Sequence, residues 1–410
     1  MSSGWSSGIT TTSVTIGGSS AGAGTFTATD NSDSALTNGT LGFTFYPSSF
    51  SVTTGSTTPS AGSPFTLTAT AKDSAGTTVS RYAGTVALSV NYTSPTSGTK
   101  SLSTTSATCS AGVCSVAALS YPDAGQITIT VKDTTYVSGV TIQGTSATLT
   151  MKPASLSLTL RPLPASLTKV YVNQPFEMIV KALAADGAVT PNYRGTVTLS
   201  STGASIGSAT HTFVVGDLAS HTFTDLRASG AGVAAVTATD GTVTSTAINV
   251  PIRAAKLVFN PAVGPPGNVY GGVYIKDTGT NTIVSEDQST RVTVTLQSPT
   301  VGSPATLMGV ANPVQLSSGL KALTIQKPDE GKVVITGSVQ GFSLPVESAT
   351  LKWANGATAS SNTTFQVLQF EQAPSSTYTY PTSYTPTTFY SPTTSSFSPT
   401  TSGFTPTTSF

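Results

Sequence analysis

The feature that most constrains this chain is an internal repeat. Residues 63–89 align without a gap on residues 174–200, and ten of the twenty-seven positions are identical. A match of this length does not arise by chance, so the chain contains at least two copies of one module. The identical pairs are Pro64 and Pro175, Phe65 and Phe176, Ala71 and Ala182, Gly76 and Gly187, Tyr82 and Tyr193, Gly84 and Gly195, Thr85 and Thr196, Val86 and Val197, Leu88 and Leu199, and Ser89 and Ser200.

Alternating apolar and polar residues dominate both copies and most of the chain around them. Residues 66–71, 126–131 and 291–296 are examples, all rich in Thr, Val, Ile or Ala. A period of two predicts strands with one buried face. No window shows helical spacing over three turns, and Gly and Pro interrupt the windows that approach it. The sequence therefore predicts an all-β fold of tandem sandwiches.

The length of 410 residues suggests three or four sandwiches of about 100 residues each. A weaker third copy, in which Lys276-Asp277 repeats the turn at Lys72-Asp73, places modules at 47–152, 153–253 and 254–371. The first 46 residues hold three short strand candidates, at 12–16, 24–29 and 41–46. These are too few for a sandwich, so we expect them to complete the first module's sheet or to bridge to a neighbouring subunit.

The repeat resembles a known family. Its Pro-Phe strand, Asp-Gly hairpin and Tyr-x-Gly-Thr-Val strand are similar to bacterial immunoglobulin-like repeats of adhesins, pilus-accessory proteins and phage virion proteins. The resemblance covers residues 63–340 approximately. It implies immunoglobulin-like β-sandwiches with spacing, adhesion or assembly roles and no catalytic residues.

The charge of the chain excludes several partners. Charged residues make up 9% of the sequence and the formal net charge is +1, without a basic cluster. We therefore expect no nucleic-acid binding. No run of eighteen apolar residues predicts a transmembrane helix. The N-terminus lacks the features of a secretory signal, so the signal was removed, export takes another route, or the protein leaves the cell in a virion.

Cys109 and Cys114 are the two cysteines, and the small residues between them predict a hairpin turn. Opposite positions on an antiparallel pair lie within disulfide range. We expect a disulfide, consistent with an extracellular protein, whereas a pair of reduced thiols would fit a cytosolic one.

The sequence offers little catalytic chemistry. His211 and His221, the two histidines, flank Asp217, so a metal site or an acid–base pair can be imagined, but no third ligand with a recognised spacing accompanies them and we predict no metal site. We interpret both as solvent-exposed strand residues. No Gly-x-Ser-x-Gly elbow or phosphate-binding loop occurs. The prediction is a protein that is not an enzyme and has no cofactor.

The carboxylates are expected at turns. Asp73, Asp186 and Asp277 lie in corresponding hairpins, where aspartate caps its own backbone. Asp30 and Asp33 form the best local cluster of oxygen ligands and give a weak indication of calcium, without the glycine and glutamate of an EF-hand loop. Asp133 and Asp240 end equivalent strands, where strand termination or calcium at a domain junction would explain them.

The tail from 372 to 410 has a different composition. From Ala373 onward it carries no charged residue, and an aromatic-[Ser/Thr]-Pro-Thr-Thr unit occurs four times. The prolines favour polyproline II, so the tail forms no core of its own. We predict that it contributes assembly contacts, although a glycosylated stalk is the alternative by composition. The predicted contact residues are Tyr384, Tyr390, Phe397, Phe404 and Phe410.

Two functions follow from these features. The first is a structural subunit of an extracellular filament, sheath or adhesive surface layer, self-assembled as a homo-oligomer through sheet edges and the tail. The second is a glycan-binding surface protein or a phage decoration or fibre protein. We expect an extracellular or cell-surface location for the first, and the virion surface is the alternative location.

Overall fold

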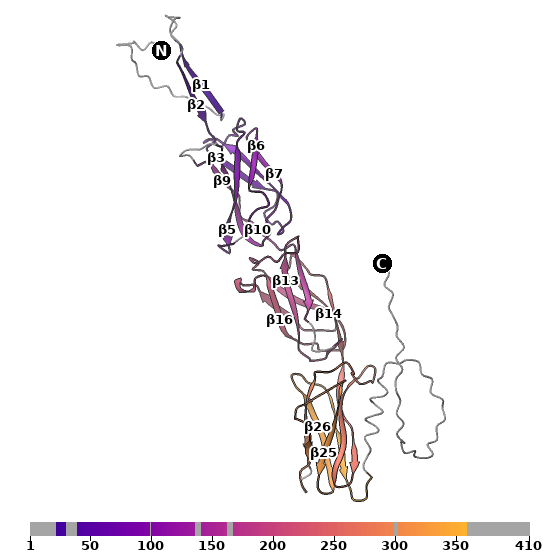
Figure 1. The fold of residues 1–410 in the computed structure, drawn as a ribbon. Coiled ribbons are helices and arrows are strands. Elements are labelled where there is room, and N and C mark those ends of the chain that lie inside the picture. Colours follow the sequence, from indigo (N-terminus) through magenta and orange to yellow (C-terminus); the bar gives the residue numbers. More distant parts are fainter. Residues whose placement is uncertain are drawn as a thin grey trace, which may run out of the picture.

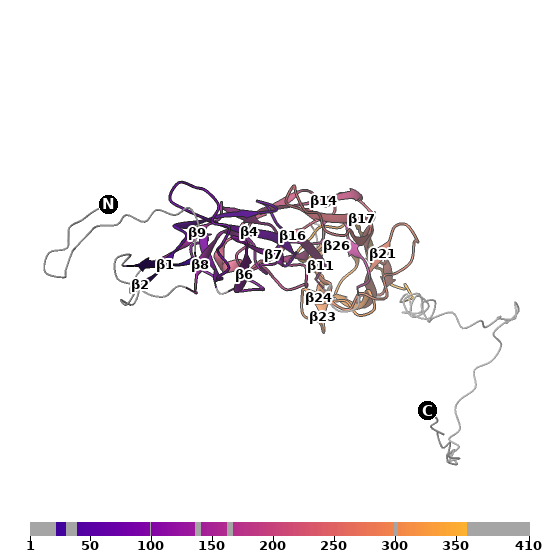
Figure 2. The same ribbon diagram turned by 90° about the horizontal axis from the view of Figure 1, so that it is seen from above.

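The structure, a computed structural model, describes residues 22–29, 39–98, 100–135, 141–161, 167–298 and 302–358. These residues form a hairpin and three β-sandwiches that follow one another in a row (Figure 1). In the view from above, the hairpin lies at one end next to the first sandwich, and the second and third sandwiches overlap (Figure 2). The predicted all-β class of tandem immunoglobulin-like sandwiches is confirmed, since the only helical segment among the described residues is the turn η1 (Val215–Asp217).

None of the helices in the described part of the chain is long and apolar enough to cross a membrane.

The first sandwich is built from one continuous eight-stranded sheet that supplies both layers. Strand β6 pairs with β5 through Ser106–Thr108 and with β7 through Cys109 and Ser110, so it passes from one layer to the other. The alternating residues of β4 are buried and exposed in turn, as their period of two predicts. The strands are β3 (Ser49–Thr54), β4 (Phe65–Lys72), β5 (Thr85–Ser94), β6 (Ser106–Ser110), β7 (Val113–Leu119), β8 (Gly125–Asp133), β9 (Gln143–Thr145) and β10 (Leu149–Met151).

The second sandwich has two separate layers. A three-stranded sheet, in the order β11-β13-β16, faces a five-stranded sheet in the order β12-β18-β17-β14-β15. Buried side chains from both layers, such as Met178 and Val236, form one core. The strands are β11 (Ser155–Leu160), β12 (Val170–Tyr171), β13 (Phe176–Leu183), β14 (Thr196–Gly203), β15 (Ala209–Thr212), β16 (Ser220–Leu226), β17 (Gly232–Thr239) and β18 (Ile248–Arg253).

The third sandwich pairs two five-stranded sheets, β23-β25-β21-β19-β27 and β20-β28-β26-β22-β24. Its core includes Trp353, which is 1% exposed and donates its indole N–H to the Gly267 carbonyl at 3.0 Å. The strands are β19 (Ala255–Phe259), β20 (Ala262–Gly264), β21 (Gly267–Asp277), β22 (Arg291–Gln297), β23 (Thr306–Met308), β24 (Val314–Gln315), β25 (Leu320–Lys327), β26 (Gly331–Val339), β27 (Val346–Glu347) and β28 (Ala349–Trp353).

The three sandwiches share one closing contact. In each, a short early segment runs parallel to the last strand. Ser60 pairs with Lys152 in the first sandwich, and β12 pairs with β18 in the second. In the third sandwich, β20 pairs with β28 in the same way. The last strand is thereby held at the point where the chain leaves each domain.

The N-terminal strands differ from the prediction. In the part of the chain that the structure describes, strands β1 (Gly22–Ala28) and β2 (Gly39–Phe45) pair only with each other and form a separate two-stranded sheet. The expectation that they extend the first sandwich's sheet is wrong. That sheet ends at β3 and β10, and neither pairs with the hairpin. The strand predicted at 12–16 lies outside the described residues.

Candidate functional site

A buried pair of side chains forms a hydrogen bond across the joint between the second and third sandwiches. The hydroxyl of Tyr171 donates a hydrogen bond to Oδ2 of Asp287 at 2.9 Å, and both side chains are fully buried. The Tyr171 ring also stacks on Phe342, with centroids 5.7 Å apart and planes within 16°. Tyr171 therefore belongs to the core of the third sandwich, although its strand β12 belongs to the second. The two domains share packing at this joint.

Charged side chains reinforce the same joint. The Arg253 guanidinium forms an ion pair with Glu286 and lies 5.7 Å above the centre of the Tyr171 ring. Glu286 also accepts a hydrogen bond from the Thr168 hydroxyl at 2.7 Å. Arg253 is only 9% exposed, and charge pairs removed from water in this way require close complementary partners. These contacts fix the angle at which the third sandwich follows the second.

Two open grooves flank this joint. The first, about 260 Å³, is lined by charged residues that include Lys169, Arg253 and Glu286. The second, about 300 Å³, is lined by Gln174, Arg291, Gln340 and Phe342 among others. Both grooves draw their walls from two domains, so their shape depends on the joint.

The joint between the first and second sandwiches uses small residues and backbone groups. The Ala185 amide donates a hydrogen bond to the Ala61 carbonyl at 2.9 Å. Gly62 has φ +74°, and a Cβ at that position would lie 3.0 Å from the Ala185 nitrogen. Asp123, 2% exposed, accepts a hydrogen bond from the Asn192 amide at 3.1 Å. The two domains approach closely here because no side chain separates them.

The two joints differ because the repeat differs at two positions. In the alignment of parallel closing contacts, Tyr171 of the second sandwich stands where Ser60 stands in the first. Asp287 of the third sandwich occupies the position of Tyr193 in the second. The backbone amide of each donates a hydrogen bond to the carbonyl three residues earlier, Val284 and Thr190 respectively. A tyrosine and an aspartate therefore meet at one joint, whereas the other has a serine at the tyrosine's position.

The tyrosines of the repeat bind the two aspartates that end equivalent strands. The Tyr193 hydroxyl donates to Oδ2 of Asp240 at 2.9 Å, and the Tyr82 hydroxyl donates to Asp133. Burial first, then the Asp240 carboxylate, raises the pKa of Tyr193 above its usual range. Asp133 and Asp240 thus bind a tyrosine of their own sandwich, a role that the sequence interpretation did not include.

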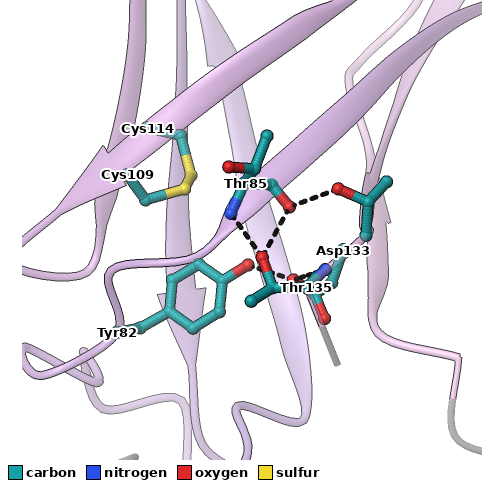
Figure 3. Close-up of a disulfide and its surroundings, with 7 residues drawn as sticks. Tyr82, Thr85, Cys109, Cys114, Asp133 and Thr135 are labelled. Carbon is teal, nitrogen blue, oxygen red and sulfur yellow. Dashed lines mark hydrogen bonds between the residues drawn. A yellow bond between two sulfur atoms is a disulfide. The ribbon is translucent and has the colours of Figure 1, made fainter. Parts of the chain in front are cut away.

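The disulfide expected from the cysteine spacing is present. Cys109 and Cys114 are direct partners in the β6–β7 register, with Cα atoms 4.0 Å apart. Both are buried in the core of the first sandwich. Figure 3 shows the bond beside Tyr82 and Asp133, close to the point where β6 crosses between layers. The covalent bond holds this crossing strand to β7.

A second side-chain cluster bridges the two layers of the second sandwich. His211 lies on β15, an edge strand of the five-stranded sheet, and His221 on β16, an edge strand of the three-stranded sheet. Their rings stack with centroids 3.3 Å apart. Asp217 in η1 faces both, with Oδ2 2.8 Å from Nε2 of His211 and Oδ1 3.9 Å from Nδ1 of His221. These three ligand atoms lie within 4.8 Å of one another.

The interpretation of both histidines as solvent-exposed strand residues is therefore wrong. Their side chains are only 23% and 25% exposed, for His211 and His221 respectively. The edges of Phe213 and Phe223 pack against the rings, with centroids 5.3 Å from His211 and 4.9 Å from His221. The missed signal is the tripeptide His-Thr-Phe, which occurs at both histidines and places imidazole and phenyl on the same strand face.

The charge state of the cluster follows from its surroundings. Burial alone would raise the pKa of Asp217, but the Val214 amide at 2.7 Å and the His211 ring outweigh it and hold that pKa below its usual range. Burial and the neighbouring His211 ring lower the pKa of His221, against the opposing effect of Asp217. At neutral pH the cluster therefore offers a carboxylate and a neutral imidazole.

The remaining predicted residues divide into three groups. Asp73 and Asp277 cap their own turns, accepting amide hydrogen bonds from Thr77 at 2.8 Å and Gly279 at 2.8 Å. Asp186 accepts a hydrogen bond from the Ala188 amide at 3.0 Å. It lies two residues further along its turn than Asp73 does in the first sandwich. The calcium indication at Asp30 and Asp33 lies outside the described residues. So do the five tail residues Tyr384, Tyr390, Phe397, Phe404 and Phe410.

Together, the repeated sandwiches and their short joints define a tandem array of immunoglobulin-like domains. No protein-family model matches the chain, and no curated protein sequence matches it. Among solved structures, it is similar to the Escherichia coli adhesin FdeC, at 17% identity and a TM-score of 0.37, covering 76% of this chain and 100% of that one.

Two other bacterial proteins are similar in the same way. The D0-D1 domain of intimin is 19% identical, with a TM-score of 0.20, and the match covers 49% of this chain and 97% of that one. Invasin, described as a bacterial integrin-binding protein, is 14% identical, with a TM-score of 0.25, and the match covers 75% of this chain and 60% of that one. Likenesses at this level carry no conclusion about function, which is argued below from the chain's own residues.

Proposed function

We propose that this chain is a non-enzymatic structural protein of an extracellular surface, in which a stiff row of sandwiches holds assembly or adhesion elements away from their anchor. The observation that carries the proposal is the tightness of the joints. Only residues 152–154 separate β10 from β11, and only Ala254 separates β18 from β19. Linkers this short leave little room for independent domain motion, and the Tyr171–Asp287 pair reduces it further.

The composition supports self-assembly into a filament, sheath or adhesive layer. Charged residues make up 9% of the chain, so few lysines are available to keep exposed sheet edges apart. Within the described residues, the β1–β2 hairpin pairs with no other strand, and its cross-strand partners Phe26 and Leu41 are 40% and 66% exposed. A two-stranded sheet with such exposed side chains is marginal in water and gains stability by pairing with another chain.

The tail supplies the second assembly element in this proposal. Prolines separate its predicted contact residues Tyr384, Tyr390, Phe397, Phe404 and Phe410 along a segment that is uncharged from Ala373 onward. Each ring buried in a partner's groove would contribute about 1.5–3 kcal/mol, and proline lowers the cost of ordering the backbone. Several rings together can therefore give a net attraction that one ring cannot.

Electron microscopy of the purified full chain tests assembly. We expect polymers for the full chain and shortened or absent polymers for a chain that ends at residue 358. None of the described core residues lies beyond Trp353, so the truncated sandwiches should keep their melting temperature. A second, full-length variant replaces the five predicted contact residues Tyr384, Tyr390, Phe397, Phe404 and Phe410 with serine. Polymers of unchanged length in both variants would contradict the role of the tail.

The extracellular location has a separate test. Antibodies against the sandwiches should label intact cells, and external protease should remove the signal. Labelling that appears only after the cells are lysed would contradict a surface role, and labelling of released particles would favour a virion protein.

A glycan-binding function is the second candidate, favoured by one groove. Gln174, Gln340 and Arg291 offer amide and guanidinium donors beside the Phe342 ring, a combination that suits neutral sugars. A glycan array probed with the full chain tests it. Binding that is lost on Gln340→Ala would support this candidate, and an array without signal would contradict it.

A further inference from the structure

The His211–Asp217–His221 cluster occupies the place of the disulfide in the second copy of the repeat. Val180, the register partner of His221, corresponds in the repeat to Ala69, the register partner of Cys114. His221 therefore stands at the position of Cys114.

The other histidine falls beside the second cysteine position. His211 pairs with Val197, and Ala107 pairs with the corresponding Val86. His211 thus corresponds to Ala107, which lies two residues before Cys109 and on the same strand face. The place that the first sandwich closes with a covalent bond is occupied in the second by two imidazoles and a carboxylate, which lie between its two layers.

We propose that His211, Asp217 and His221 bind one divalent transition-metal ion of the Zn²⁺ class, which joins the two layers of the second sandwich at the place that the disulfide occupies in the first. Two imidazole nitrogens and one carboxylate oxygen are a ligand set that zinc accepts. Calcium and magnesium prefer ligands that are all oxygen, so they do not fit this set.

Metal binding requires the two imidazole rings, which stack with centroids 3.3 Å apart and planes within 5°, to turn apart so that both nitrogen lone pairs point to one ion. Ligands of a tetrahedral zinc ion lie about 3.4 Å apart, from bonds of about 2.1 Å. The ligand atoms of the cluster are already within 4.8 Å of one another. The Val214 amide holds the carboxylate through Oδ2 at 2.7 Å, while Oδ1 faces His221. Such outer contacts orient metal ligands in known sites.

The connecting loop holds strain that fits a positioned ligand. The first sandwich turns through Ala111 and Gly112, whereas the second uses the longer connection 213–219. Leu218 and Ala219 there have φ values of +49° and +62°. Two consecutive residues with side chains in the left-handed region cost stability. The loop keeps this conformation while it carries Asp217 back between the two histidines.

Access to the site is open on one side. Phe213 and Phe223, 1% and 5% exposed, form its apolar floor. The histidine side chains remain about a quarter exposed, so an ion can enter from solvent and keep a water molecule as its fourth ligand.

Zinc titration of the full chain without an affinity tag tests the proposal. Because the chain has two histidines and both cysteines are bonded, these imidazoles are its only nitrogen or sulfur side-chain ligands of the kind zinc prefers. Calorimetry should give one Zn²⁺ per chain. His221→Gln should weaken binding at least about 100-fold. The matched control Asp186→Asn, which removes a turn carboxylate of the same sandwich, should leave binding unchanged.

A measurement on the unmodified protein guards against variants that fail to fold. The imidazole NMR signals of both histidines should shift together when ZnCl₂ is added, and CaCl₂ should leave them unmoved. A wild-type chain that takes up no zinc at 100 µM, or a His211→Gln/His221→Gln variant that binds as tightly as the wild type, would overturn the proposal.

Discussion

The Tyr171 hydroxyl in the second sandwich lies 2.9 Å from Oδ2 of Asp287 in the third, and neither side chain reaches solvent. Asp287 also accepts hydrogen bonds from the amides of Ser289 at 3.0 Å and Thr290 at 2.9 Å. The carboxylate is therefore well satisfied within its own loop, and the tyrosine adds the contact that crosses between domains.

Replacing Tyr171 with phenylalanine should weaken this joint without unfolding either sandwich. The ring keeps its packing against Phe342, but Asp287 loses one partner, at a cost of about 1–3 kcal/mol. Chemical denaturation should show this loss. Tyr270→Phe, at a tyrosine that is 45% exposed, is the control and should change stability by less than about 0.5 kcal/mol. Equal effects of the two substitutions would contradict the assigned role.

The same tyrosine should make the joint sensitive to alkaline pH. Burial first, then the Asp287 carboxylate, raises the pKa of Tyr171 above its usual range. Because the folded pKa exceeds the unfolded value, this stabilisation is complete below about pH 10 and is lost as the pH rises toward the folded pKa. Melting curves from pH 8 to pH 11 should fall more steeply for the wild type than for Tyr171→Phe. Equal changes of melting temperature with pH in the two proteins would show that Tyr171 does not contribute to the alkaline sensitivity.

The joint between the first and second sandwiches should respond to a single methyl group. Gly62→Ala places a Cβ 3.0 Å from the Ala185 nitrogen and 3.4 Å from the Ala184 Cβ. Gly76→Ala is a matched control, because it has a similar φ of +80° but nothing within 4 Å of the added atom. Small-angle X-ray scattering should show a wider range of domain orientations only for Gly62→Ala. The same change in both variants would assign the effect to backbone strain.

Removal of the disulfide should cost moderate stability. Cys109 and Cys114 close a very short loop, so the entropy model gives a stabilisation of at most about 2 kcal/mol. The Cys109→Ala/Cys114→Ala variant should remain folded, and the first sandwich should unfold at a lower denaturant concentration. Mass spectrometry of the unreduced wild-type peptide should give a mass two hydrogens below the reduced one. An unchanged midpoint would show that the bond adds no stability.

The sequence predicted the parts of this structure that depend on local periodicity. Residues 66–71, 126–131 and 291–296 lie in β4, β8 and β22, because alternation directly encodes which face is buried. The sequence did not predict the contact between Tyr171 and Asp287, since 116 residues separate them and neither belongs to a recognised motif.

The histidine cluster was missed for a different reason. His211 and His221 sit on edge strands of opposite layers, and only the fold of the η1 loop brings Asp217 between them. Their spacing of ten residues matches no known ligand pattern. The register of the repeat, which places His221 at the position of Cys114, becomes visible only when the strands are paired.

The parallel closing contacts determine how the row of domains responds to force. When the chain is pulled from both ends, the early segment and the last strand of each sandwich are drawn in opposite directions along their common axis. The hydrogen bonds between β12 and β18, and between β20 and β28, are then loaded in shear. Bonds in shear share the load and break together, whereas bonds at the end of a hairpin open one at a time. A row of such domains therefore resists sudden pulling within each of its three sandwiches.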